Sequence, residues 1–228
     1  MLHILALETT EMIGSVAAAI DDNLLLELQL DTQKRSAQSL APAVRSLLEK
    51  AAWKPSEVQL VAVTIGPGSF TGLRVGLTMA KVFAYAVGAE LLGLDTLEAI
   101  AAAAPAEVQA VSTAVDAQRG DVVAQSFQRR QDGSFEPQGP AELLPANDWL
   151  QRLPGGAIVS GPALRKHLEA LPPGVIATPP QCWSPTAGNV ARLAFQHYTA
   201  GRRDDLWNLM PVYSRPSAAE EKWHRLGK

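Results

Sequence analysis

The stretch from residue 65 to residue 76, IGPGSFTGLRVG, places four glycines and a proline between two apolar segments. The segment before it, residues 58–65, is nearly all apolar, which is typical of a strand buried on both faces. We expect the segment after it to form a helix that reaches about Gly88. Because free N–H groups and the helix dipole favour anions at a helix N-terminus, one prediction is an anion site at Gly66, Gly68 and Ser69.

The spacing of this stretch does not match the established phosphate and nucleophile motifs. A P-loop requires a lysine that is missing here, and a dinucleotide fingerprint requires glycine where Thr71 stands. A nucleophile elbow requires serine at Phe70, and no histidine lies near Ser69 in the sequence to activate its hydroxyl. A rigid strand-to-helix turn, with Ser69 or Thr71 as the N-cap, is therefore the favoured interpretation.

Small residues recur at every fourth position of the expected helix. A step of four residues rotates by only about 40° around a helix, so successive members share one face and admit a close neighbour. That neighbour is either another part of this chain or a second subunit, and the spacing does not decide between them. Phe83 and Val87 flank this ridge, whereas Arg74 and Lys81 lie off it. The ridge comprises Gly72, Gly76, Ala80, Ala84 and Gly88.

The pattern of strands and helices occurs twice along the chain. Three short apolar runs at residues 3–8, 14–20 and 24–30 predict a meander, and a helix is expected from about Ser39. After Pro105 a similar pattern restarts, with strands at 108–116, 121–127 and 141–144. In each half a strand ends in an acid, Glu8 or Asp116, and a turn with glycine follows. This indicates either an internal duplication or two unrelated hairpins.

Composition narrows the class of protein. The 228 residues carry 20 basic and 23 acidic side chains, so the net charge of −3 does not favour nucleic-acid binding by this chain alone. A single cysteine, Cys182, excludes an internal disulfide, and the four histidines lack metal-ligand spacing. Charged residues interrupt the longest apolar region, 73–94, and no signal peptide is visible. We expect a soluble, cytoplasmic protein without a membrane span.

Four segments together resemble the bacterial TsaB (YeaZ) family. The resemblance covers nearly the whole chain and implies an α/β fold of the actin, sugar-kinase and Hsp70 (ASKHA) class, with two βββαβα-type lobes. We expect an N-terminal lobe at residues 1–104, which pairs with other subunits, and a C-terminal lobe plus tail at 105–228. The segments are GPGSFTGLRVGLTMAK (66–81), ILALETT (4–10), VDAQRGDVV (115–123) and PVYSRP (211–216).

The resemblance also implies a function. Members of the family assist the catalytic subunit TsaD, with the ATPase TsaE, in making N6-threonylcarbamoyladenosine at position 37 of tRNAs that read codons starting with A. The implied protein is a non-catalytic subunit without cofactors, which binds TsaD, forms a homodimer in its absence and meets tRNA through the complex. The implied interface comprises Phe70, Gly72, Leu73, Gly76, Ala80, Phe83, Ala84 and Val87.

Two departures from the catalytic relatives favour a subunit without chemistry. Residues 33–44, where TsaD-like proteins carry paired metal-binding histidines, contain none, and the first acidic turn is Glu8-Thr9-Thr10 instead of an Asp-Thr-Ser-like turn. An ATP-dependent phosphotransferase that uses Glu8 and Asp116 is the main alternative, and a metalloprotease is the weakest. The tail from Arg215 onward, with Lys222, Arg225 and Lys228, either contacts a partner or tRNA or is solvated.

Overall fold

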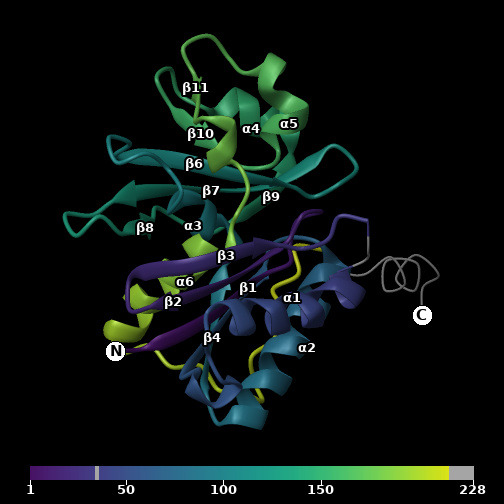
Figure 1. Cartoon of the computed structure of the whole chain (residues 1–228). Helices are drawn as coiled ribbons and strands as arrows, with labels where there is room; N and C mark the ends of the chain where they lie inside the picture. Colours follow the sequence, from purple (N-terminus) through teal and green to yellow (C-terminus); the bar gives the residue numbers. More distant parts are fainter. Residues whose placement is uncertain (34–35, 216–228) are drawn as a thin grey trace.

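The computed structural model describes residues 1–33 and 36–215 and shows two stacked sheets flanked by helices (Figure 1). The strand order of the first sheet is β3-β2-β1-β4-β5. The predicted meander is confirmed, since β1, β2 and β3 pair antiparallel, whereas β4 and β5 extend the sheet in parallel to β1. The bounds are β1 (His3–Glu8), β2 (Ser15–Ile20), β3 (Asn23–Gln29), β4 (Leu60–Gly66) and β5 (Glu90–Asp95).

Two helices, α1 (Ser36–Lys50) and α2 (Phe70–Val87), lie against each other on the outer face of the first sheet (Figure 1). Alternation along β1 directs Leu5 and Leu7 toward these helices. The N-cap of α2 is Ser69, as one alternative predicted, and Gly88 ends the helix in the left-handed conformation. The start of α1 was predicted too late, because Ser39 is buried inside the helix.

The opposite face of the first sheet is covered by α6 (Ala187–Thr199) and α3 (Thr96–Ala101). Ile4 and Ala6 of β1 point to this side and contact the apolar stripe of α6. Here the packing differs from the predicted boundaries, which assigned all residues after 104 to the C-terminal lobe. The reason is that the apolar face of α6 is buried against the N-terminal sheet, not against the sheet that precedes it in sequence.

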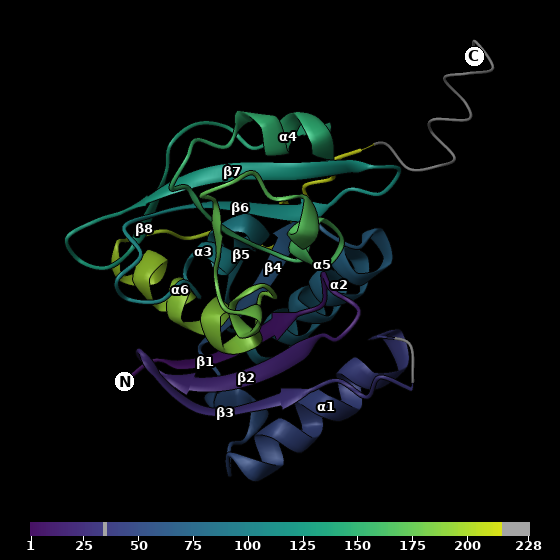
Figure 2. The ribbon, with the colours of Figure 1, turned by 90° about the horizontal axis from the view of Figure 1, so that it is seen from above.

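The second sheet has the order β11-β10-β6-β7-β8, with β9 paired to β7. Its inner face packs on α3, and α4 and α5 cover its outer face. In Figure 2, α4 lies at one end of the stacked layers and α1 at the other. The strands β8, β10 and β11 were not predicted. The bounds are β6 (Ala110–Asp116), β7 (Asp121–Arg129), β8 (Phe135–Pro137), β9 (Glu142–Pro145), β10 (Ile158–Ser160), β11 (Ile176–Ala177), α4 (Ala146–Arg152) and α5 (Leu164–His167), with 3₁₀ turns at Pro55–Glu57, Leu168–Ala170 and Pro180–Cys182.

The two sheets repeat one arrangement. In the first, β1 lies between its antiparallel neighbour β2 and its parallel neighbour β4; in the second, β6 lies between antiparallel β7 and parallel β10. The acids Glu8 and Asp116 end the two equivalent strands, β1 and β6. The duplicated pattern of the sequence therefore corresponds to a duplicated structure.

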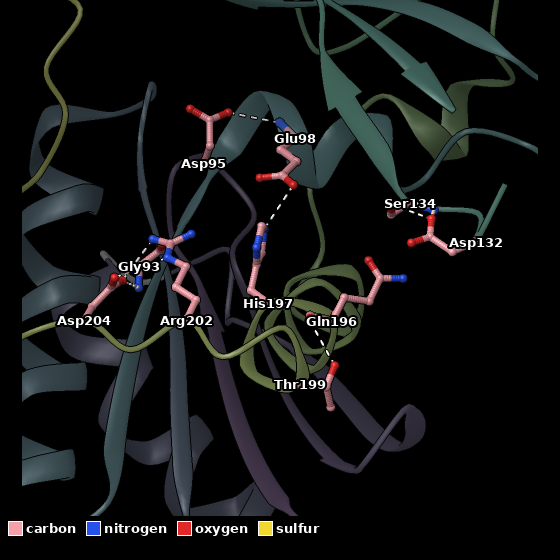
Figure 3. A network of polar contacts seen from close by, with 10 residues as sticks. All are labelled: Gly93, Asp95, Glu98, Asp132, Ser134, Gln196, His197, Thr199, Arg202 and Asp204. Atoms are coloured by element: carbon pink, nitrogen blue, oxygen red, sulfur yellow. Dashed lines mark hydrogen bonds and ion pairs between the residues drawn. The ribbon is translucent and has the colours of Figure 1, made fainter. Parts of the chain in front are cut away.

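Residues 202–215, which we call the C-terminal strap, return to the N-terminal lobe after α6. Arg202 and Asp204 hydrogen-bond the backbone of Gly93 at the free edge of β5, at 2.6 Å and 2.8 Å (Figure 3). Farther along, the N–H of Val212 donates to the carbonyl oxygen of Ile65 at 2.7 Å. The strap therefore covers the β5 edge and places its last residues beside the start of α2.

Candidate functional site

The glycine loop and the first acidic turn form one packed unit at the end of β1. The Thr9 hydroxyl donates to the carbonyl oxygen of Gly72 at 2.8 Å, and a side chain at Gly72 or Gly76 would overlap Thr9. A side chain at Gly68 would likewise overlap Thr10. Three of the glycines are thus explained by the close approach of the Thr9-Thr10 turn.

Glu8 lies at the centre of this unit and is fully buried. One of its carboxylate oxygens, Oε1, accepts hydrogen bonds from the backbone N–H of Thr10, at 2.6 Å, and from the Thr10 hydroxyl. The other oxygen, Oε2, has no hydrogen-bond partner among the described residues. Desolvation raises the pKa of Glu8 to about 7, although the two hydrogen bonds from Thr10 act in the opposite direction.

Contacts within the chain occupy part of the predicted anion site, which comprises Gly66, Gly68 and Ser69. The N–H of Ser69 donates to the carbonyl oxygen of Thr10 at 2.9 Å, and the N–H of Gly72 donates to the Ser69 hydroxyl at 3.3 Å. Gly66 lies directly under the carbonyl oxygen of Val212 in the strap. The donors that an anion would use at Ser69 and Gly72 are therefore satisfied by the chain itself, and Gly66 is covered.

The second acidic turn has different partners. Asp116 pairs with Lys166 of α5 at 2.5 Å and accepts the backbone N–H of Gln118 at 3.2 Å. Glu8 is enclosed in the N-terminal lobe, so within the part of the chain that the structure describes the two acids have no partner in common and do not form one carboxylate pair. This arrangement does not favour the phosphotransferase alternative, which would need both acids at a common reacting centre.

A groove of about 730 Å³ lies between the lobes, and its charged side chains already have partners within the chain. Arg165 of α5 contacts Glu11 at 2.7 Å and Ser184 at 2.5 Å, and Glu27 accepts the N–H of Gly188 at the start of α6 at 3.2 Å. The acids outnumber the one cation in this lining, which is unfavourable for a triphosphate. Within residues 1–33 and 36–215, no cluster of histidine, cysteine, aspartate or glutamate side chains is arranged to hold a metal ion.

The small-residue ridge of α2 faces inward. Five residues of the predicted interface are buried inside this chain, so they cannot be the contacting surface of a second subunit in this fold; they are Gly72, Leu73, Gly76, Ala80 and Ala84. The physical reason is the close approach of the ridge to Thr9 and to the first sheet. Phe70, Phe83 and Val87 remain partly exposed.

The outer face of α2 and the strap together expose large apolar side chains. Val82 and Tyr85 on α2 are 60% and 69% exposed, and Trp207 and Met210 on the strap are 68% and 65% exposed. The ring of Tyr85 meets that of Trp207 at 5.4 Å between centroids, and Tyr213 follows at the N-terminal end of α2. We call these five residues, Val82, Tyr85, Trp207, Met210 and Tyr213, the α2–strap surface.

The sequence reasoning missed this surface. The ridge drew attention to the small residues, although the side chains available to a partner lie on the other side of the same helix. The apolar density of residues 206–213, LWNLMPVY, was a usable signal for the part of this surface that lies on the strap. Of the basic tail, Arg215 pairs with Asp121; Lys222, Arg225 and Lys228 lie outside the described residues.

The strap and α6 are tied to the N-terminal lobe by a polar network (Figure 3). His197 of α6 contacts Glu98 of α3 at 3.0 Å, and Asp95 caps α3 by accepting the N–H of Glu98 at 3.0 Å. Burial raises the pKa of Asp95 to about 6. Arg202 also pairs with Asp204 at 2.9 Å, which orients both side chains toward Gly93. These contacts fix the strap before it reaches α2.

Comparisons with known proteins agree with this architecture. Residues 30–173 match the family model described as TsaD, tRNA N6-adenosine threonylcarbamoyltransferase. The tRNA threonylcarbamoyladenosine biosynthesis protein TsaB of Bacillus subtilis is 28% identical, over 97% of this chain and 98% of that protein. The structure of YeaZ from Pseudomonas aeruginosa has a TM-score of 0.81 and 27% identity, over 93% of this chain and 100% of that one.

A more distant structure shares the fold alone. The activator of the 2-hydroxyisocaproyl-CoA dehydratase from Clostridium difficile has a TM-score of 0.52 at 9% identity, over 90% of this chain and 99% of that one. The predicted ASKHA-type α/β fold is confirmed. Among the helices of the described residues, none is long and apolar enough to cross a membrane.

Proposed function

Because the chain belongs to the TsaB (YeaZ) branch of the TsaD family, we propose that it is a non-catalytic subunit that binds and activates TsaD. The complex makes N6-threonylcarbamoyladenosine in tRNA, and TsaE joins it as the ATPase. The chain itself meets tRNA only through the complex, is cytoplasmic, and forms a homodimer when TsaD is missing.

The observation that carries this proposal is the α2–strap surface. Exposed patches of large apolar side chains are typical of protein–protein interfaces. Aromatic residues are enriched among the residues that contribute most of the binding energy in such interfaces. The turns that follow Glu8 and Asp116 support the same conclusion. Glu8 accepts a hydrogen bond from Thr10, and Asp116 pairs with Lys166, so both acids have partners within the chain. A subunit that retained the fold and uses a helix face for assembly accounts for both features.

The test compares binding of TsaD to the wild type and to the double variant Val82→Glu/Tyr85→Glu. Two charges in an apolar contact would remain unpaired, so we expect the dissociation constant to rise at least about tenfold. Modification of tRNA in a reconstituted reaction should fall accordingly. Isothermal titration calorimetry and light scattering measure affinity and mass.

Leu143→Glu is the matched control, since Leu143 is 44% exposed on the C-terminal lobe. We expect this variant to bind TsaD as the wild type does. Wild-type affinity of the double variant would contradict the proposed surface. Turnover of ATP or cleavage of a peptide by the purified chain alone would contradict its non-catalytic role.

A further inference from the structure

Arg74 projects from the first turns of α2 and is held in place by two aromatic rings. Its guanidinium carbon lies 3.8 Å from the centroid of the Phe70 ring and 5.7 Å from that of Tyr213. Its Nε donates to the Tyr213 hydroxyl at 2.9 Å. The side chain is nevertheless exposed, so the two terminal nitrogens of the guanidinium are available to a partner.

This arginine differs from most others in the chain. Among the described residues, carboxylate partners are seen for Arg45, Arg130, Arg152, Arg165, Arg192, Arg202, Arg203 and Arg215. Arg74 has no carboxylate partner within residues 1–33 and 36–215, although Phe70 and Tyr213 contact its side chain. Its contacts orient the guanidinium without neutralising it.

The surroundings of Arg74 give the surface a positive end. The sequence of α2 contains two basic residues, Arg74 and Lys81, and no acidic one. Lys81 donates to the carbonyl oxygen of Trp207 at 3.0 Å, so its ammonium group is partly satisfied. On the strap, one carboxylate oxygen of Asp205 caps the N–H groups of Trp207 and Asn208, at 2.9 Å and 2.7 Å. Of these two cations, Arg74 has the Tyr213 hydroxyl as its one polar acceptor in the described part of the chain.

We propose that Arg74 is a specificity-determining residue of the α2–strap surface, which receives an aspartate or glutamate carboxylate from the partner protein. An arginine side chain that is already held in one rotamer loses little entropy on binding. Its planar guanidinium can donate two parallel hydrogen bonds to one carboxylate. The proposal rests on the proposed function, because it assigns a partner chemistry to the same surface. A second copy of this chain is the less suitable occupant, since pairing two α2 helices would bring the basic residues of both together.

The experiment measures binding of full-length TsaD to the wild type, Arg74→Met and Arg74→Lys at low and high salt. Arg74→Met keeps the apolar stem and removes the charge, and we expect its dissociation constant to rise by about 10-fold or more. Arg74→Lys should recover only part of the loss, because lysine lacks the fork. The wild type should lose affinity as salt rises, and Arg74→Met should lose much less.

Lys81→Met is the matched control for loss of one positive charge on α2. We expect it to change affinity less than threefold, since its ammonium group is already engaged by Trp207. Tyr213→Phe removes the hydroxyl that holds Nε and should weaken binding severalfold. Melting curves verify that each variant is folded.

The outcomes separate this inference from the proposed function. If Arg74→Met binds like the wild type while Val82→Glu/Tyr85→Glu does not, the surface is correct and the role of Arg74 is refuted. If neither variant weakens binding, the surface itself is refuted. If Arg74→Met dissociates a homodimer and leaves TsaD binding unchanged, the occupant is a second copy, which also overturns the inference.

Discussion

At the scale of single residues, the most informative group is the buried carboxyl of Glu8. It ends the first strand, where the sequence suggested a catalytic acid, yet its contacts are those of a structural group. One oxygen holds the Thr10 backbone and hydroxyl, and burial raises its pKa to about 7. A carboxyl whose pKa is raised by burial keeps its proton to a higher pH than an exposed one and is a weaker ligand for a cation.

This raised pKa predicts a pH dependence of folding stability. The usual pKa of 4.5 applies to the unfolded chain, so between pH 4.5 and about 7 only the folded state keeps the Glu8 proton. Stability should therefore fall as pH rises through this window and level off above it. The loss is on the order of 3 kcal/mol at 1.36 kcal/mol per unit.

The variant Glu8→Gln cannot ionise and should lose this part of the pH dependence. Urea unfolding at pH 5 and pH 8 measures the free energy of unfolding of both proteins. Asp95 also has a raised pKa and is present in both, so the difference between the two proteins isolates Glu8. Equal pH dependence of the wild type and the variant would exclude this role of Glu8.

At the scale of elements, α2 performs two tasks on two faces. Its inner face carries the small residues that admit Thr9, and its outer face carries Arg74, Val82 and Tyr85. The strap adds Trp207 and Met210 to the outer face from far along the chain. A helix whose inner face is firmly seated provides a rigid platform for its outer face.

Gly72→Ala tests the seating of α2. Alanine favours helix by up to about 1 kcal/mol, but its methyl group would overlap the Thr9 carbonyl oxygen, which belongs to the backbone. We expect a net destabilisation of about 1–3 kcal/mol in thermal or urea unfolding.

Gly155→Ala is the control, because nothing lies within 4 Å of a side chain at that position. It should leave the stability nearly unchanged. A Gly72→Ala protein as stable as the wild type would show that the contact with Thr9 relaxes at little cost, and that the ridge does not require glycine there.

At the scale of the whole molecule, the two lobes share a duplicated fold, but their equivalent acids, Glu8 and Asp116, do not meet at a common reacting centre. Their acids have separate partners, and the groove between them is lined by paired charges. Arg165–Glu11 and Arg215–Asp121 connect residues of different lobes. The molecule therefore presents its prominent apolar surface on the outside of the N-terminal lobe.

We expect ATP and ADP at millimolar concentration to leave the melting temperature of the isolated chain unchanged. The loop donors at Ser69 and Gly72 are satisfied internally, so a phosphate would have to displace them. A ligand at one hundred times its dissociation constant would add about 2.7 kcal/mol of stability, which differential scanning fluorimetry detects easily. A clear rise of the melting temperature with either nucleotide would contradict this account of the loop donors.

Much of the architecture was predictable from local patterns. The strands of the first sheet, the helix that follows the glycine loop and its Ser69 cap come from apolar periodicity and capping chemistry, which act over a few residues. Both halves repeat the order of strand, acid and turn, a pattern that left duplication and two unrelated hairpins open, and the equivalent pairing of β1 and β6 decides for duplication. The short strand β8 carries too few residues to show a period.

The sequence by itself determined the longer elements and their order, and it showed that the turns lack the phosphate and nucleophile motifs, because these features depend on residue types and short spacings. Only the tertiary structure decided which face of α2 is buried, that α6 and the strap belong with the first sheet, and that Tyr213 holds Arg74. These contacts join residues far apart in the sequence, 63 positions for Thr9 and Gly72 and 139 positions for Arg74 and Tyr213. Their partners are selected by packing in three dimensions, which no local pattern encodes.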